Sequence, residues 1–151
     1  MTGHLFLDTT PLGLLTQRTG RPEAEACRDW LASRLSSGVN VYIPEIADYE
    51  LRRELVRAGK TAGVARLDLL KDSLRYLPIT TEAMLLAADL WARARRRGFV
   101  TADEKALDGD VILAAQALSS GIAASEIIVV TSNPSHLSHF LAARRWEEIG
   151  A

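Results

Sequence analysis

The chain has 151 residues, a formal net charge of −1, 48% hydrophobic residues and 25% charged residues. These values are typical of one globular domain with a substantial core, and they exclude a protein whose overall charge alone attracts nucleic acid or a membrane surface. The single cysteine, Cys27, excludes an internal disulfide and is typical of a reducing compartment, so we expect a cytoplasmic protein.

Short apolar runs recur along the chain and predict buried β-strands, because they are bounded by polar or turn residues and are rich in β-branched side chains. The clearest of them is the sequence IIVV near the C-terminus. The predicted strands are Leu5–Leu7, Val39–Ile43, Leu74–Ile79, Ile127–Val130 and Trp146–Ile149.

Longer segments with apolar residues at helical spacing separate these runs. Several of them end at a glycine, as helices often do, and the segment that starts at Asp110 is apolar nearly all round, which predicts a buried helix. The predicted helices are Pro22–Ser36, Pro44–Ala58, Gly63–Ser73, Glu82–Arg97, Asp110–Ser119 and Ser135–Arg145.

The alternation of strands and helices predicts an α/β fold with a mostly parallel sheet, helices on both faces and right-handed crossovers. We expect a single domain over residues 1–151, because no linker or repeat interrupts the pattern. The one substantial loop is expected at Val100–Gly109. No run reaches the ~18 apolar residues of a membrane-spanning helix, and the N-terminal segment lacks the features of a signal peptide.

Polar residues follow the carboxyl ends of the predicted strands, where ligands bind in open parallel sheets. Each has a structural explanation when it is taken alone. A cap of a turn or helix explains Asp8, Asp108, Asp110 and Asn133, and a solvated helix face explains Glu50.

Taken together, these residues predict a metal site. Three carboxylates from separate segments, Asp8, Glu50 and Asp110, are expected at one edge of the sheet. Clustered carboxylates raise the pKa of one another unless a cation lies among them. Oxygen ligands favour Mg²⁺ or Mn²⁺, and such an ion suits phosphoryl chemistry because it neutralises phosphate charge and activates water.

Four motifs in this order resemble those of the PIN domains, a family that includes the VapC-type ribonuclease toxins. The resemblance covers essentially the whole chain, and its most specific part is an aspartate four residues before an Ala-Ala pair. The motifs are LFLDTTPLG at Leu5–Gly13, IPEIADYELRREL at Ile43–Leu55, LDGDVILAAQAL at Leu107–Leu118 and VVTSNPSHL at Val129–Leu137.

The resemblance implies a three-layer α/β/α fold with a five-stranded sheet of order 3-2-1-4-5. It also implies Mg²⁺- or Mn²⁺-dependent cleavage of RNA that leaves a 5′-phosphate, a small antitoxin that blocks the site, and a homodimer. In this family's pattern the metal ligands would be Asp8 and Asp110, with Glu50 as a further ligand or as the group that orients or deprotonates water. The fourth position is the neutral Asn133, so we expect one well-bound ion and a weak or substrate-dependent second.

Further residues are candidates for accessory roles. Thr9 and Thr131 hydroxyls could position phosphate or water, and Asp108 could assist the metal through water, although we favour a helix cap for it. RNA contacts are expected from Arg52, Arg53 and Arg57, because they share a helix with Glu50. The later residues Arg93, Arg95, Arg96 and Arg97 fit a solvated helix end, and His136 and His139 fit capping or packing, because no acid is close to them in the sequence.

Two alternatives stay open at this point. A catalytically silent PIN-like module that binds RNA or protein would fit the neutral Asn133 and the modest basic charge. A haloacid-dehalogenase-like phosphatase would fit the sequence Leu5–Asp8, but that family's nucleophile motif requires a second aspartate where this chain has Thr10.

Overall fold

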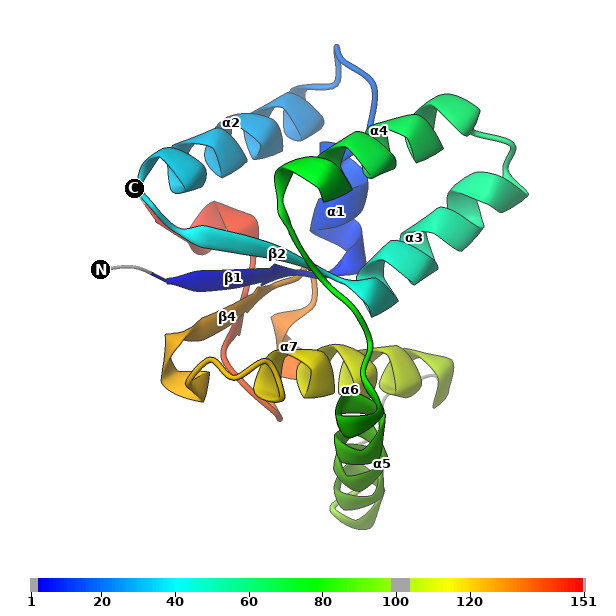
Figure 1. Cartoon of the computed structure of the whole chain (residues 1–151), viewed down its shortest axis with the longest axis vertical. Helices are drawn as coiled ribbons and strands as arrows, with labels where there is room; N and C mark the ends of the chain where they lie inside the picture. Colours follow the sequence, from blue (N-terminus) through cyan, green and yellow to red (C-terminus); the bar gives the residue numbers. More distant parts are fainter. Residues whose placement is uncertain (1–2, 99–103, 151) are drawn as a thin grey trace.

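The computed structural model describes residues 3–98 and 104–150 and contains a five-stranded sheet (Figure 1). All neighbouring strands pair in parallel, in the order β3-β2-β1-β4-β5, which confirms the predicted sheet. The strands are β1 (His4–Leu7), β2 (Asn40–Pro44), β3 (Arg75–Leu77), β4 (Ile127–Val130) and β5 (Ala143–Arg144).

Helices cover both faces of this sheet and give the three layers (Figure 1). The α-helices are α1 (Thr9–Leu15), α2 (Pro22–Ser36), α3 (Glu45–Arg57), α4 (Thr61–Ser73), α5 (Thr81–Arg96), α6 (Glu104–Leu118) and α7 (Pro134–Leu137). Two short 3₁₀ helices are η1 (Ala124–Glu126) and η2 (Trp146–Glu148). Within the described residues, no helix is long and apolar enough to cross a membrane.

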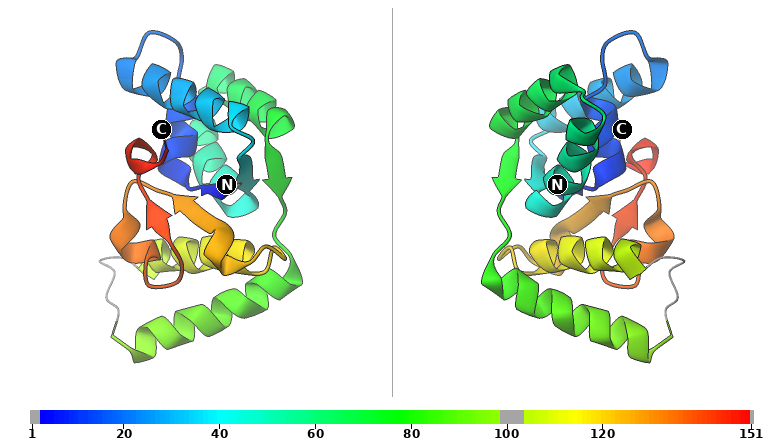
Figure 2. Two further views of the ribbon diagram at one scale, coloured as in Figure 1. Left: turned by 90° about the vertical axis from the view of Figure 1, so that its left-hand side faces the viewer. Right: turned by 90° about the vertical axis from the view of Figure 1, so that its right-hand side faces the viewer.

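Side chains that alternate along β1 divide the core in two, because successive strand residues point to opposite faces of a sheet. Leu5 and Leu7 belong to the cluster with α1, α2 and the start of α3, whereas Phe6 belongs to the cluster with α5 and α6. Helix α6 lies between the sheet and α5 (Figure 2), so it is buried on two sides, as its all-round apolar sequence predicts.

The register of the central strands places the site. Leu7 pairs with Val130, and the backbone N–H of Asp8 donates to the carbonyl of Val130 at 2.9 Å. β1 and β4 therefore end side by side, and the residues that follow them, Asp8 and Thr131, emerge at the same edge of the sheet.

The structure differs from the predicted elements at three places near the two termini. Helix α1 was not predicted, because Pro11 and Gly13 obscure its pattern; Asp8 starts it as N-cap. The last strand is β5 and not Trp146–Ile149, where the chain forms η2 and the ring of Trp146 packs 6.0 Å from that of Trp30. The predicted helix Ser135–Arg145 is only the single-turn α7, because the chain must extend again to pair β5 with β4.

Helix α6 also starts earlier than predicted. Of the expected loop Val100–Gly109, residues 100–103 lie outside the described part of the chain and residues from Glu104 onward are helical. Asp108 and Asp110 therefore lie inside the helix and do not cap its start. This corrects the cap that we favoured for Asp108 and removes the structural explanation of Asp110 as a cap. The difference matters because an aspartate inside a helix projects sideways from it and does not need to bond the helix's own N–H groups.

Candidate active site

Asp8 is held by groups from two different segments. Its Oδ1 accepts a hydrogen bond from the backbone N–H of Thr9 at 2.7 Å, so the carboxylate caps α1. Its Oδ2 accepts from the hydroxyl of Thr131 at 2.8 Å. Burial raises the pKa of Asp8, and these hydrogen bonds oppose that rise because they favour the charged form.

Glu50 reaches the same place from the second turn of α3. The hydroxyl of Thr9 donates to Glu50 Oε1 at 2.8 Å. On the other side, the carboxylate lies against the backbone of α6 at Gly109, where a Cβ would be 2.6 Å from Glu50 Oε2. Burial raises the pKa of Glu50, and the nearby charge of Asp8 raises it further. The close approach of the Glu50 carboxylate to the backbone of α6 therefore requires a glycine at position 109.

Asp110 projects from α6 between these groups. Its Oδ2 is buried and has no hydrogen-bond partner. Burial, followed by the charges of Asp8 and Glu50, raises the pKa of Asp110 to about 7. A buried carboxylate oxygen without a donor is unfavourable, and a cation beside it would remove the cost.

Thr131 and Asn133 complete the edge at the end of β4. Thr131 is buried, and its Oγ accepts from the backbone N–H of Asn133 at 3.1 Å while it donates to Asp8. Asn133 occupies the N-cap position of α7 with Pro134 next, but its side chain makes no capping hydrogen bond. Instead the hydroxyl of Ser135 donates to Asn133 Oδ1 at 2.8 Å, and Asn133 Nδ2 lies 3.2 Å from His136 Nδ1.

An open cleft of about 380 Å³ brings these side chains together. The predicted residues that line it are Asp8, Thr9, Glu50, Arg53, Asp110, Thr131 and Asn133. The cleft is also lined by Glu54, Ser132 and His136. Asp108 is exposed and is not part of it.

His136 is the residue that sequence reasoning missed. Its Nδ1 lies 3.7 Å from Asp110 Oδ2, so the statement that no acid is near it holds along the chain but not in space. His139 does not line the cleft, and its ring meets that of Phe140 edge-on. The sequence does not indicate which of the two histidines lies at the cleft, because that depends on the packing of α7 against α6 in the fold.

The three arginines of α3 have different surroundings. Arg53 lines the cleft and its guanidinium lies 5.2 Å from the ring centre of Tyr49. Arg52 bonds Asp48 at 2.9 Å and Asp68 at 2.8 Å, which joins α3 to α4 outside the cleft. Arg57 pairs with Glu54 on the exposed end of the helix. Of the three, Arg53 has the position from which a side chain can reach a phosphate in the cleft.

The donors fit a divalent cation, although the site is not already closed around one. Within residues 3–98 and 104–150, no three His, Cys, Asp or Glu side chains are arranged as a ready metal site. Asp8 and Glu50 each accept a threonine hydroxyl, and only Asp110 has an unsatisfied buried oxygen. The pKa values of all three acids are raised, chiefly because burial disfavours their charged forms. A cation bound beside them would stabilise the charged forms and lower these pKa values.

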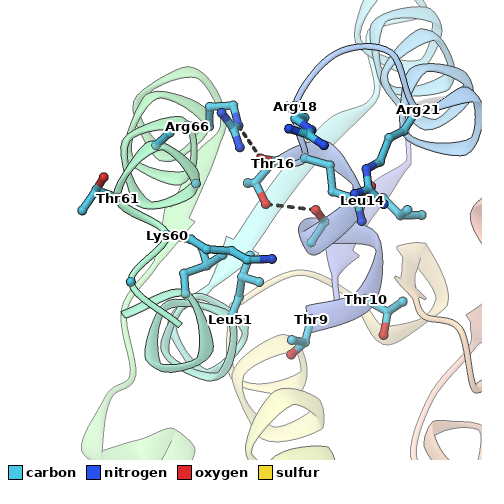
Figure 3. A pocket seen from close by; sticks show the side chains of 16 residues that line it. Thr9, Thr10, Leu14, Thr16, Arg18, Arg21, Leu51, Lys60, Thr61 and Arg66 are labelled. Atoms are coloured by element: carbon cyan, nitrogen blue, oxygen red, sulfur yellow. Dashed lines mark hydrogen bonds between the residues drawn. The ribbon is translucent and has the colours of Figure 1, made fainter. Parts of the chain in front are cut away.

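A larger groove of about 800 Å³ lies beside the cleft, between α1, α3 and α4, and shares Thr9 with it (Figure 3). Leu14, Leu51 and Leu55 provide apolar lining. Arg66 donates from its side chain to the carbonyl of Thr16, which fixes one wall. The basic residues that line the groove are Arg18, Arg21, Lys60 and Arg66.

The chain is similar to known proteins in sequence and in fold. The model of the PIN domain family matches residues 5–138. No curated protein matches the sequence. Among solved structures, a chain of VapBC2 from Rickettsia felis bound to a DNA fragment from the promoter has a TM-score of 0.70 and 14% identity, with 95% of this chain and 98% of that chain covered.

Two further structures are similar. A chain of VapBC-1 from nontypeable Haemophilus influenzae has a TM-score of 0.65 and 15% identity over 96% of this chain and 99% of that one. A chain of DNA-bound VapBC from Salmonella typhimurium has a TM-score of 0.64 and 20% identity over 95% and 98%. At sequence identities of 14%, 15% and 20%, the structural similarity establishes the fold alone.

Proposed function

The chain belongs to the PIN domain family, and on this basis we propose that it is a single-domain, cytoplasmic endoribonuclease that hydrolyses RNA phosphodiester bonds with Mg²⁺ or Mn²⁺. The observation that supports the proposal most is the meeting of three carboxyl groups in one cleft, with the buried Oδ2 of Asp110 lacking any donor. An active site of this composition requires a cation to become stable in its charged form.

Asp8 and Asp110 would hold the metal ion directly, with Glu50 beside them. When bound, the ion would neutralise charge on the phosphate and lower the pKa of a coordinated water. Glu50 orients the attacking water and accepts its proton, and its raised pKa makes it a stronger base than an ordinary carboxylate. The water oxygen attacks phosphorus and the bond to the 3′-oxygen breaks. The 3′-oxygen takes up a proton and leaves as a hydroxyl, and the phosphate remains on the 5′-oxygen of the other product.

The threonines keep these acids in place. The Thr131 hydroxyl holds Asp8 Oδ2 and the Thr9 backbone N–H holds Asp8 Oδ1, so both oxygens of this carboxylate are fixed. The Thr9 hydroxyl holds Glu50 Oε1, and Glu50 Oε2 lies against α6. Arg53 would contact the RNA phosphate, because it is the α3 arginine at the cleft. The neutral Asn133 favours a single well-held ion over two.

We also propose that the chain is the toxin of a toxin–antitoxin pair. The similar structures are VapBC complexes, and the groove beside Thr9 combines basic and apolar lining. Such a lining suits a small antitoxin segment with acidic and apolar side chains, which would end at the entrance of the cleft. A homodimer is the further expected assembly; Met84, Leu85 and Trp91 leave large apolar surface exposed on α5.

The decisive experiment is RNA cleavage with Mn²⁺, comparing the wild type with Asp110→Asn. Asp108→Asn is the matched control, because it makes the same chemical change two residues earlier in α6 and outside the cleft. We expect cleavage by the wild type and the control, and its loss in Asp110→Asn. Equal cleavage by all three would refute the assignment of the site.

A catalytically silent binding module is the second candidate. It is favoured by the neutral Asn133 and by the absence, among the described residues, of a ready three-ligand metal site. Calorimetry separates the two: no heat of Mn²⁺ binding at sub-millimolar concentration, together with RNA binding without cleavage, would favour the module. Hydrolysis of small phosphomonoesters would instead favour a phosphatase.

A further inference from the structure

We propose that His136 is a nitrogen ligand of the metal ion in this cleft, and that the site therefore prefers Mn²⁺ or a later transition ion over Mg²⁺. The inference rests on the proposed function, because it adds a ligand to the same site. Imidazole suits transition ions, whereas Mg²⁺ prefers an all-oxygen shell that includes water.

The distance between two side chains is the first step. His136 Nδ1 lies 3.7 Å from Asp110 Oδ2, and that oxygen is buried without a partner. This separation is too long for a hydrogen bond between them. Two metal–ligand bonds of about 2.1 Å span at most about 4.2 Å. An ion therefore fits between the two atoms, and it would satisfy the oxygen that no protein donor reaches.

The hydrogen bonds of Asn133 give the second step. The Ser135 hydroxyl donates to Asn133 Oδ1 at 2.8 Å, which leaves the amide NH₂ on the side of His136, 3.2 Å from Nδ1. The neutral amide therefore faces the same ring nitrogen that lies near Asp110, and both side chains line the cleft. A metal ion on Nδ1 would take the place of this amide contact.

This arrangement also explains a role for the neutral residue Asn133. An ionised aspartate there could only accept hydrogen bonds, so it would favour a proton on Nδ1 and compete with a metal ion for the ring. Asparagine contacts Nδ1 at 3.2 Å through a neutral amide and orients the ring without a negative charge that would hold a proton on it. We infer that Asn133 is a positioning residue for His136, and that nitrogen ligation replaces the charged fourth ligand that this chain lacks.

The fold keeps His136 over the cleft. It is the third residue of α7, whose Pro134 begins the helix and whose Leu137 is buried in the core, so this short helix is anchored at both ends. The His136 side chain is 35% exposed, which leaves room for an ion to enter. His139, one turn later and outside the lining of the cleft, is the natural control.

The experiment uses the full chain with Mn²⁺ and measures electron spin echo modulation, which detects nitrogen bound to the ion without any turnover. We expect an imidazole nitrogen coupling in the wild type, its change on ¹⁵N-histidine labelling, its loss in His136→Gln and its persistence in His139→Gln. Equilibrium titrations accompany it: His136→Gln should lower Mn²⁺ affinity about tenfold or more and change Mg²⁺ affinity much less.

The outcomes separate this inference from the proposed function. Mn²⁺ bound without nitrogen coupling in the wild type overturns the role of His136 and leaves the carboxylate site standing. Failure of the wild type to bind Mn²⁺ overturns both proposals. Coupling that survives in His136→Gln but is lost in His139→Gln also overturns the assignment. The wild-type spectrum needs no variant, so it decides the matter even if His136→Gln does not fold.

Discussion

The hydroxyl of Thr131 donates to Asp8 Oδ2 at 2.8 Å, which joins two residues that are 123 positions apart in the chain. The bond links the ends of β1 and β4 across the edge of the sheet where the acids meet. It favours the charged form of Asp8 against the effect of burial, so it prepares this carboxylate for a cation.

Removal of this hydroxyl should therefore weaken metal binding more than it weakens the fold. In Thr131→Val the pKa of Asp8 rises further, and Mn²⁺ affinity at neutral pH falls. The lost hydrogen bond should lower the free energy of unfolding by about 1 kcal/mol, measured by denaturant titration. Thr10→Val is the control, because Thr10 is an exposed residue of α1. Mn²⁺ affinity that is the same in both variants would contradict the role of Thr131.

Gly109→Ala should inactivate the protein without unfolding it. The added Cβ would lie 2.6 Å from Glu50 Oε2, so the carboxylate must move away from α6 and from its place in the cleft. Alanine in a helix interior favours folding by roughly 0.5–1 kcal/mol relative to glycine, which offsets part of the strain. RNA cleavage and thermal unfolding measured together test this.

Gly13→Ala is the matched control for that change. Gly13 is also helical, and a Cβ there would meet Leu51 Cδ1 at 3.7 Å, an ordinary contact. We expect Gly13→Ala to retain cleavage. Full activity of Gly109→Ala would show that the position of Glu50 against α6 is not required.

The raised pKa of Asp110 predicts how stability without metal depends on pH. The pKa is about 7 in the folded protein against an ordinary value of 3.8, so between these values the folded state holds a proton that the unfolded state has lost. The free energy of unfolding in EDTA should therefore fall as pH rises from about 4 to about 7, and level off above. Asp110→Asn should flatten this slope.

Saturating Mn²⁺ should reverse the trend, because an ion that binds the charged carboxylate displaces the proton. Mn²⁺ affinity is then expected to rise with pH up to about 7, where Asp110 is no longer protonated. Unfolding curves recorded from pH 4.5 to 8 with EDTA and with Mn²⁺ measure both effects. A stability that increases with pH in EDTA and does not respond to Asp110→Asn would contradict the raised pKa.

The sequence was sufficient to predict that Asp8 and Asn133 come together, because they follow β1 and β4, and the ends of parallel strands meet at one edge. Glu50 and Asp110 were placed beside them by the motifs that resemble the PIN domains, and they reach the cleft from helices α3 and α6. The sequence was not sufficient for His136, whose neighbour Asp110 is 26 positions away and reaches it only through the packing of α7 on α6. Helix boundaries failed for a similar reason. Before the predicted start of α6 at Asp110, Leu107 is buried in the core, a tertiary contact that the local sequence pattern does not show.

The arginines of α3 provide the last prediction. Arg53→Ala should weaken RNA binding and cleavage with little change in stability, because this exposed residue lines the cleft and its guanidinium lies over the ring of Tyr49 in the same helix. Arg52→Ala should do the opposite, because it removes the closest partner of Asp48, which is only 6% exposed. The substitution leaves the buried carboxylate of Asp48 only partly paired, which should lower the free energy of unfolding by about 1–3 kcal/mol. Lys71, 4.0 Å from Asp48, limits the loss.

RNA affinity and denaturant unfolding of both variants measure the contrast, and a larger loss of RNA affinity in Arg52→Ala than in Arg53→Ala would reverse our assignment of the RNA contact.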